Sequence, residues 1–354
     1  MQGAQTVRRT ALVFTILAGA VVALLVDGQL GPMPAAAAAQ VITACPGPLN
    51  PIIVDTELGA DLVATPADNP CVRFGAPNIG LRLRGFAIDM RGAGVATAID
   101  TNGQNRVLIL GDDGFVVTSY VSPGLVAAIL VNGGSDVRVE EVQVRNVQVG
   151  FPAATAPCVL VASRGGTGMF LTGVTGARVI GNLVECYARG VDVFASTASS
   201  TAFSEREIGR NIIRDNTSNA TECEVQKCSG LRLGGASGWY VLFNTVTGNG
   251  FSPDSVFEQV GIGLFGGSSG NKVLRNVADN NIGPGISVFV QSGSGNSSGN
   301  SFVGNHATGN GPTVPADLAD AVNPTVVNVW NPNNICNNQQ GLGIPPGVCN
   351  PGEM

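Results

Sequence analysis

A short phrase of apolar and polar residues recurs five times in the second half of the chain. Each copy ends at an asparagine, with an apolar residue three positions before it and another apolar residue two positions after it. The copies end at Asn182, Asn211, Asn244, Asn276 and Asn305, so they are spaced by 29, 33, 32 and 29 residues. A near-constant period in this range is typical of solenoids and other stacked arrays.

A second pattern precedes these phrases: a glycine is followed by two apolar residues that flank one variable residue. It begins at Gly168, Gly190, Gly230, Gly261 and Gly285. Alternation with a period of two over such short stretches predicts β-strands with one buried face. Each repeat then makes one turn of a coil, whose strands pair in parallel with those of the next coil at a spacing of about 4.8 Å.

Stacked coils place equivalent residues in columns. The apolar columns become rows inside the coil, where they form the core of the fold. We expect the asparagine column to lie at a sharp corner, because Asn tolerates the left-handed backbone that such a corner requires. Each amide is expected to bond to its neighbours above and below. A second column is expected five positions on, at Asn216, Asn249, Asn281 and Asn310, with Tyr187 interrupting it. Upstream the pattern weakens, and Glu140 is expected to take the asparagine position.

The repeats over residues 241–249 and 273–281, each preceded by a strand of the glycine pattern, resemble the parallel β-helix repeats of the pectate-lyase-like superfamily. The resemblance covers residues 128–310 well and 78–127 weakly. It implies an all-β fold, a right-handed single-stranded parallel β-helix of about eight to ten coils with terminal caps. It implies no single activity, because the superfamily holds lyases, hydrolases, epimerases, phage tailspikes, adhesins and a copper-maturation family.

The two ends of the chain differ from the repeats. Residues 1–39 contain an arginine pair, an apolar run and an alanine tract, which predict a signal peptide, with an uncleaved anchor as the alternative. We expect residues 40–77 to cap the first coil and residues 78–330 to form the β-helix. Residues 331–354, which contain prolines and two cysteines, are expected to form the C-terminal cap.

The eight cysteines are an even number, which favours disulfides and an oxidising compartment. Proximity along the chain favours the couples Cys45 with Cys71, Cys158 with Cys186, Cys223 with Cys228, and Cys336 with Cys349, although other connectivities remain open. His306 is the only histidine, so neither a zinc nor a copper site is expected. The sequence therefore assigns no metal and no cofactor.

Charged residues make up only 12% of the chain, and the formal net charge is -6. An acidic chain without a basic cluster is not expected to bind nucleic acid. No membrane contact is expected beyond the possible signal anchor, and the oligomeric state stays open. We expect a secreted, periplasmic or cell-surface protein that binds extracellular polysaccharide or serves as a surface scaffold. The alternative is a carbohydrate-active enzyme, a polysaccharide lyase or glycoside hydrolase with an unrecognised catalytic set.

The resemblance implies a substrate groove on the outside of the strands that follow the glycine pattern. Asp192 and Arg232 take the variable, outward position of that pattern on successive coils, so we expect them to face each other and bind a ligand. The alternative is an ordinary surface ion pair. Trp239 and Tyr240, near the loops at 217–229 and 250–260, are expected either to offer an aromatic platform for sugar rings or to cover their own corner.

No catalytic residue is assigned. The pair Asp112 and Asp113 is not accompanied by the GlyHisGly turn of polygalacturonases and is expected to lie in a loop. Two further carboxylate pairs, Glu205 with Glu207 and Asp254 with Glu258, are expected in loops that leave the coil at different corners. Solvated loop charges are the simpler interpretation of these residues.

Overall fold

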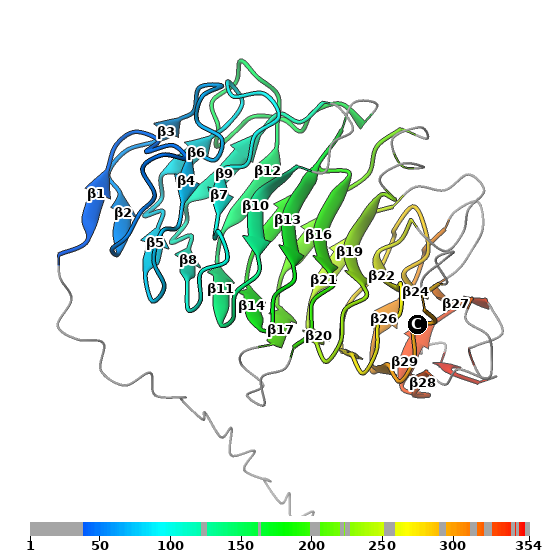
Figure 1. Ribbon diagram of the computed structural model, residues 1–354. Coiled ribbons are helices and arrows are strands. Elements are labelled where there is room, and N and C mark those ends of the chain that lie inside the picture. Colours follow the sequence, from blue (N-terminus) through cyan, green and yellow to red (C-terminus); the bar gives the residue numbers. More distant parts are fainter. Residues whose placement is uncertain are drawn as a thin grey trace, which may run out of the picture. The chain divides into compact units, whose positions relative to one another are not determined.

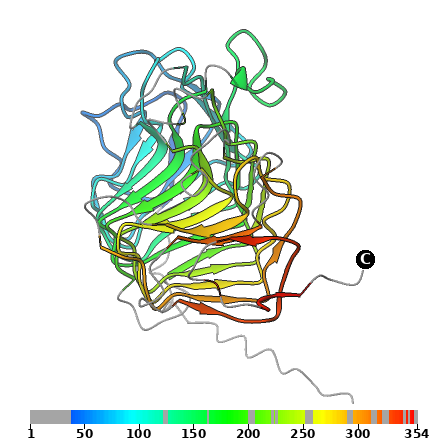
Figure 2. The same cartoon turned by 90° about the vertical axis from the view of Figure 1, so that its right-hand side faces the viewer.

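The computed structural model describes residues 38–121, 126–161, 164–198, 206–219, 223, 227–250, 259–289, 295–311, 317–321, 328–340, 344 and 347–350. These residues form an all-β solenoid, a parallel β-helix in which each coil adds one strand to each of its faces (Figure 1). Viewed after a rotation of 90°, the strands of successive coils lie in register behind one another (Figure 2). Within the described part, no helix is long and apolar enough to span a bilayer.

An eleven-stranded parallel sheet forms one face of the coil. In stacking order its strands are β1 (Gln40–Ile42), β2 (Thr56–Leu58), β5 (Gly80–Arg82), β8 (Leu108–Leu110), β11 (Val137–Glu140), β14 (Ala177–Ile180), β17 (Arg206–Gly209), β20 (Tyr240–Leu242), β23 (Lys272–Leu274), β25 (Ser301–Val303) and β28 (Val329–Trp330). The first two strands lie in the segment expected to be a cap, so the stacked strands begin before residue 78.

A ten-stranded parallel sheet, which contains the strands of the glycine pattern, forms the second face. Its strands are β4 (Val72–Arg73), β7 (Ile99–Asp100), β10 (Ala127–Asn132), β13 (Thr167–Thr172), β16 (Arg189–Phe194), β19 (Ser229–Gly234), β22 (Ile262–Phe265), β24 (Ile286–Val288), β27 (Leu318–Asp320) and β30 (Gln339–Gln340). We refer to its solvent side as the ten-stranded outer face.

The third face consists of a seven-stranded and a three-stranded sheet. The first contains β3 (Leu62–Val63), β6 (Ala87–Asp89), β9 (Phe115–Thr118), β12 (Gln143–Asn146), β15 (Leu183–Glu185), β18 (Ile212–Arg214) and β21 (Thr245–Thr247). The second contains β26 (His306–Ala307), β29 (Asn334–Cys336) and β31 (Cys349–Asn350). Single bridges from Thr245 to Val277 and from Val277 to His306 connect them, so the face is continuous.

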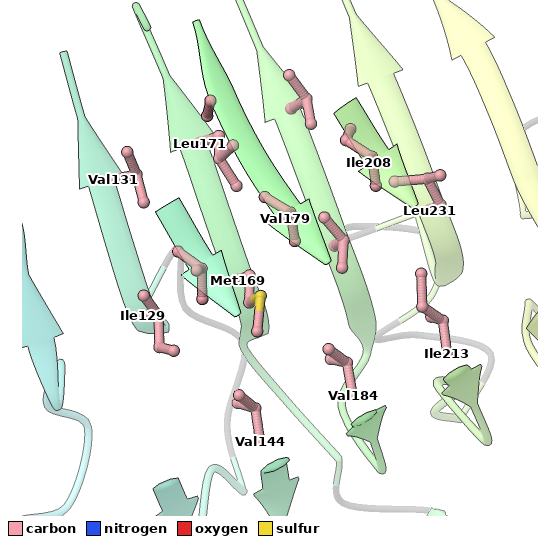
Figure 3. Close-up of a cluster of buried hydrophobic side chains, with 14 of the residues drawn as sticks. Ile129, Val131, Val144, Met169, Leu171, Val179, Val184, Ile208, Ile213 and Leu231 are labelled. Atoms are coloured by element: carbon pink, nitrogen blue, oxygen red, sulfur yellow. The ribbon is translucent and has the colours of Figure 1, made fainter. Parts of the chain in front are cut away.

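The core consists of aliphatic rows that run along the axis, one coil above another (Figure 3). Met169, Val191 and Leu231 form part of one row, because their strands pair residue by residue. Each of these side chains is fully buried. Side chains from the other two faces, such as Val179 and Val184, meet this row in the interior. This arrangement confirms the predicted solenoid with an apolar lining.

The predicted asparagine ladder is present and fully buried. The Nδ2 atom of Asn211 donates to Oδ1 of Asn244 at 2.9 Å, and Nδ2 of Asn244 donates to Oδ1 of Asn276 at 2.9 Å. Each amide also donates to a backbone carbonyl of the preceding coil, as Asn244 does to Ile208 at 2.8 Å. The second column, through Asn216, Asn249, Asn281 and Asn310, bonds in the same way. The ladders therefore satisfy buried backbone groups at two corners of the later coils.

The left-handed residue at these corners is the one before the asparagine, which differs from our expectation. Arg210, Phe243 and Arg275 have φ values of 56°, 57° and 53° and directly precede ladder asparagines. The asparagine side chain is thus selected for its hydrogen bonds. The expected place of Glu140 was also wrong, because Glu140 pairs with Ile180, and it is the backbone N–H of Val142 that donates to Oδ1 of Asn182.

A third ladder, which the sequence analysis missed, lies at the corner between the ten-stranded and eleven-stranded sheets. Asn271 donates to Asn300 at 2.9 Å, and Asn300 donates to Asn328 at 3.0 Å. In the sequence, Asn271 and Asn300 each stand five positions before an asparagine of the first ladder, Asn276 and Asn305 respectively. All three corners of the later coils therefore carry a buried amide.

Four disulfides join Cys45 to Cys71, Cys158 to Cys186, Cys223 to Cys228, and Cys336 to Cys349. These are the couples that proximity along the chain favoured. Three of them connect successive coils. Cys45 and Cys71 are 26 residues apart, Cys158 and Cys186 are 28 residues apart, and Cys336 and Cys349 lie on the paired strands β29 and β31. They add covalent links between coils, where the fold otherwise depends on hydrogen bonds and packing.

Candidate functional site

The four residues expected to bind a ligand do not gather in one place. Asp192 and Arg232 are register partners on β16 and β19, and both lie on the ten-stranded outer face. Tyr240 is half-buried on the outer face of the eleven-stranded sheet, where it pairs in register with Glu207. Trp239 is fully buried, and its Nε1 donates to the carbonyl of Ser196 at 3.1 Å. Trp239 is thus a core residue, and an exposed platform formed by both rings is absent from this corner of the described structure.

The ion pair of Asp192 is with Arg189 on the same strand. Nη1 of Arg189 lies 2.6 Å from Oδ2 of Asp192, and both side chains are almost entirely buried. Among the described residues, Oδ1 of Asp192, Nε of Arg189 and Oγ of Ser229 have no hydrogen-bond partner although they are buried. Buried polar atoms without partners are costly, and they are often found where a ligand or water binds. The pair therefore stands out from the other charges of this face.

The sequence analysis missed Arg189 because strict alternation over three positions places it on the opposite side of the strand from Asp192. The backbone departs from that alternation at Gly190. A Cβ atom there would lie 2.5 Å from the carbonyl oxygen of Gly230 and 2.6 Å from Cγ2 of Ile213. Only glycine fits such a contact, so the glycine of the repeated pattern is required for close packing of β16 against the next coil. An arginine directly before this glycine is the signal that was overlooked.

Beyond Asp192, toward the C-terminal coils, the ten-stranded outer face is closed. We call this part the closed half, which consists of Arg232, Phe265, Ser287 and Phe289, all with 6% or less of their surface exposed. The guanidinium of Arg232 lies 4.3 Å from the ring centroid of Phe265, and the rings of Phe265 and Phe289 stack with their centroids 5.2 Å apart. Cation–π and stacking contacts thus fix the side chains of the closed half.

Toward the N-terminal coils, the same face is open. We call this part the open half, which consists of Leu130, Asn132, Phe170, Thr172 and Phe194 on β10, β13 and β16, all partly or fully exposed. Phe170 is the register partner of Asp192, and Phe194 pairs with Thr172. Phe194 has 46% of its surface exposed, so its ring is accessible from solvent. The open half therefore presents two aromatic rings beside the Arg189–Asp192 pair.

On the eleven-stranded sheet, Glu207 is buried beside charged residues. Burial raises the pKa of its carboxyl, while Arg210 and Arg178 act against that shift. The Oε1 atom lies 3.9 Å from Nη1 of Arg210 and folds back over Gly209, where it would be 2.5 Å from an added Cβ. Glu207 is thus in strand β17 and not in the loop that the sequence analysis assigned to it.

The third face carries a charge cluster around the buried Glu185, and its role is to join neighbouring coils. Glu185 accepts from Nε of Arg145 at 2.5 Å and from Nε of Arg214 at 2.6 Å, so one carboxylate joins three successive coils. Cys158 and Cys186 lie close enough to Glu185 to suggest a metal site, but their sulfur atoms form a disulfide and no thiolate is present. This cluster therefore stabilises the stacking of the coils.

His306 is oriented by a carboxylate. Its Nδ1 atom lies 2.8 Å from Oδ2 of Asp279, which also accepts from the backbone of Thr308 through Oδ1 at 2.8 Å. The side chain of His306 is 40% exposed. An oriented imidazole is an element of acid–base catalysis, yet His306 lies on the third face, away from the Arg189–Asp192 pair.

Some of the sequence predictions fall outside the described residues. They concern Glu205, Asp254, Glu258 and the expected signal peptide.

Comparison with known proteins agrees with this architecture. Residues 127–328, more than half of the chain, match the family described as the right-handed beta helix region. Among solved structures, the A-module of the mannuronan C-5 epimerase of Azotobacter vinelandii is similar at 12% identity and a TM-score of 0.41, over 85% of this chain and 77% of that one. That likeness carries no argument about activity or ligand. No curated protein sequence matches the chain. The chain belongs to the right-handed β-helix family.

Proposed function

We propose that this protein acts outside the cytoplasm and binds a polysaccharide along the open half of the ten-stranded outer face. The observation that carries the proposal is the exposed ring of Phe194, next to Phe170 and to the buried Arg189–Asp192 pair. Aromatic rings stack on the apolar faces of sugar rings, while fixed polar groups bond to the hydroxyls and set their orientation. The open half offers both kinds of group within three neighbouring coils.

The distribution of charge supports binding more than catalysis. Asp192 is held in an ion pair by Arg189 at 2.6 Å, which fixes its carboxylate in a position to accept hydrogen bonds. Glycoside hydrolysis normally requires a second carboxylate across the scissile bond. Besides Arg189, Asp192 is accompanied on the described part of the open half by apolar, amide and hydroxyl side chains, and the next carboxylate in its outward column, Asp100, lies three strands away on β7. A polysaccharide lyase or glycoside hydrolase stays the alternative, and only Asp192 favours it.

Secretion belongs to the same proposal. The four disulfides suit an oxidising compartment, since such bonds are rare in proteins that stay in the cytoplasm. A solenoid with a flat outer face along its axis also suits an extended polymer, because successive coils repeat the same outward position at a spacing of about 4.8 Å.

The test is the affinity of Phe194→Ala for polysaccharides, measured against Phe243→Ala as control. Phe243 also has 46% of its surface exposed, but it lies at a corner away from the ten-stranded sheet. Loss of a stacking ring is worth about 1 kcal/mol, so Phe194→Ala should weaken binding by roughly three- to tenfold. Equal affinities for the two variants, across a panel of neutral and acidic polysaccharides, would place the binding site elsewhere.

A further inference from the structure

The ring of Tyr240 lies between two cations that come from the coils on either side of it. The guanidinium carbon of Arg206, on β17, is 4.8 Å from the ring centroid, and Nζ of Lys272, on β23, is 5.0 Å from it. The same two side chains approach the phenol oxygen, with Nη2 of Arg206 at 3.5 Å and Nζ of Lys272 at 3.3 Å. Three donor groups therefore converge at one point of the eleven-stranded outer face.

In the described part of the chain these two cations have no counter-ion, unlike three arginines of the same face. Arg138, Arg178 and Arg210 each lie within 4.0 Å of a carboxylate. In the described part of the chain, no carboxylate comes that close to Arg206 or Lys272, and Nε of Arg206 is buried without a hydrogen-bond partner. Glu207, the neighbour of Arg206, turns its carboxylate over Gly209 and toward Arg210. Two positive charges that approach one oxygen repel each other, and an anion between them would remove that repulsion.

We propose that Arg206, Tyr240 and Lys272 form a binding site for the oxyanion group of an acidic polysaccharide. Arginine offers a planar fork that matches two oxygens of a carboxylate or sulfate ester, and lysine adds a compact charge. The ring of Tyr240 holds the two cations on either side of it, so the anion sits at the edge of the ring. The inference rests on the proposed function for the identity of the ligand as a saccharide. The site itself lies on a different sheet from the open half.

The test compares binding of a uronic-acid oligosaccharide with binding of its carboxyl-reduced, neutral counterpart by calorimetry at low salt. The double variant R206Q/K272Q should lose about tenfold or more in affinity for the acidic oligosaccharide and less than about twofold for the neutral one. Lys272→Gln alone, at an exposed position where folding is not at risk, should lose a few-fold. Arg275→Gln removes an exposed positive charge from the adjacent corner and should leave both affinities unchanged.

Two results would overturn this proposal. One is an affinity of R206Q/K272Q for the acidic oligosaccharide that equals that of Arg275→Gln. The other is binding of inorganic sulfate at this site together with equal affinities for the acidic oligosaccharide and for its neutral form. Neither result bears on the open half, because Phe194→Ala tests that face with neutral and acidic ligands alike. A failure of the proposed function would instead appear as no binding of any polysaccharide by the unaltered protein.

Discussion

Replacing Asn244 by alanine should destabilise the protein strongly, because this side chain bonds to three coils. Its Oδ1 accepts from the backbone nitrogen and from Nδ2 of Asn211 at 3.1 and 2.9 Å. Its Nδ2 donates to the carbonyl of Ile208 at 2.8 Å and to Oδ1 of Asn276 at 2.9 Å. Alanine leaves two donors of Asn211 and the carbonyl of Ile208 without partners, whereas Asn276 still accepts from the backbone of residue 244 at 3.0 Å.

The magnitude follows from those three orphaned groups. A buried polar group without its partner costs about 1 to 3 kcal/mol. A water molecule that occupies the space of the lost amide would lower the cost, so we take the lower half of the range and expect about 3 to 5 kcal/mol. Native proteins of ordinary stability have about 5 to 15 kcal/mol in total. The variant should therefore unfold at a much lower urea concentration.

The assay is urea unfolding followed by tryptophan fluorescence, since Trp239 is fully buried five residues from Asn244. Asn333→Ala, at an exposed asparagine near the end of the ladder, is the matched control and should change the midpoint little. Asn244→Asp keeps the acceptor oxygen but replaces the NH2 donor group by a second oxygen, which faces Oδ1 of Asn276, so it should be at least as destabilising. If Asn244→Ala and Asn333→Ala unfold at the same urea concentration, the ladder does not hold the coils together.

Three further predictions concern single buried side chains. Ile262→Asp should prevent folding or secretion, because Ile262 is fully buried and a carboxylate there has no partner; an unchanged melting curve would contradict the assigned strand phase. Glu207→Gln should raise the melting temperature more at pH 7 than at about pH 4. Burial raises the folded pKa of Glu207 above its usual 4.5, so the unaltered protein loses stability as the pH rises through that range. A gain in melting temperature that is independent of pH would refute this reasoning. Glu185→Ala should cost about 3 kcal/mol by leaving Arg145 and Arg214 without their shared carboxylate, and calorimetric unfolding that matches the unaltered protein would show that the cluster adds nothing.

The fold could be predicted from the sequence because every coil repeats the same constraint. A buried asparagine must bond to the asparagine of the next coil, so Asn211, Asn244 and Asn276 had to keep a common phase along the chain. That phase remained readable although the loops between the copies vary in length. At the ends of the chain the pattern gave no guide, because strands such as Gln40–Ile42 and Cys349–Asn350 have only two or three residues and lack the ladder.

The candidate site could be predicted only in part. The register of Asp192 with Arg232 followed from the shared phase of their strands. The Arg189–Asp192 pair did not, because it depends on a local change of strand direction at Gly190. Trp239 was a candidate for an aromatic platform on the basis of its residue type, with a role in covering its own corner as the alternative, and its place one corner ahead of Asn244 puts it inside. Which side chains stay exposed depends on what the loops cover, and the repeat pattern carries no information about that.

Oxidative footprinting with hydroxyl radicals tests the proposed binding face most directly. Phe194 and Phe243 have the same exposed fraction, 46%, so they should be oxidised at similar rates in the free protein. With a polysaccharide bound, we predict that oxidation of Phe194 falls while that of Phe243 stays constant. Unchanged oxidation of Phe194, or an equal decrease at both rings, would contradict binding along the open half.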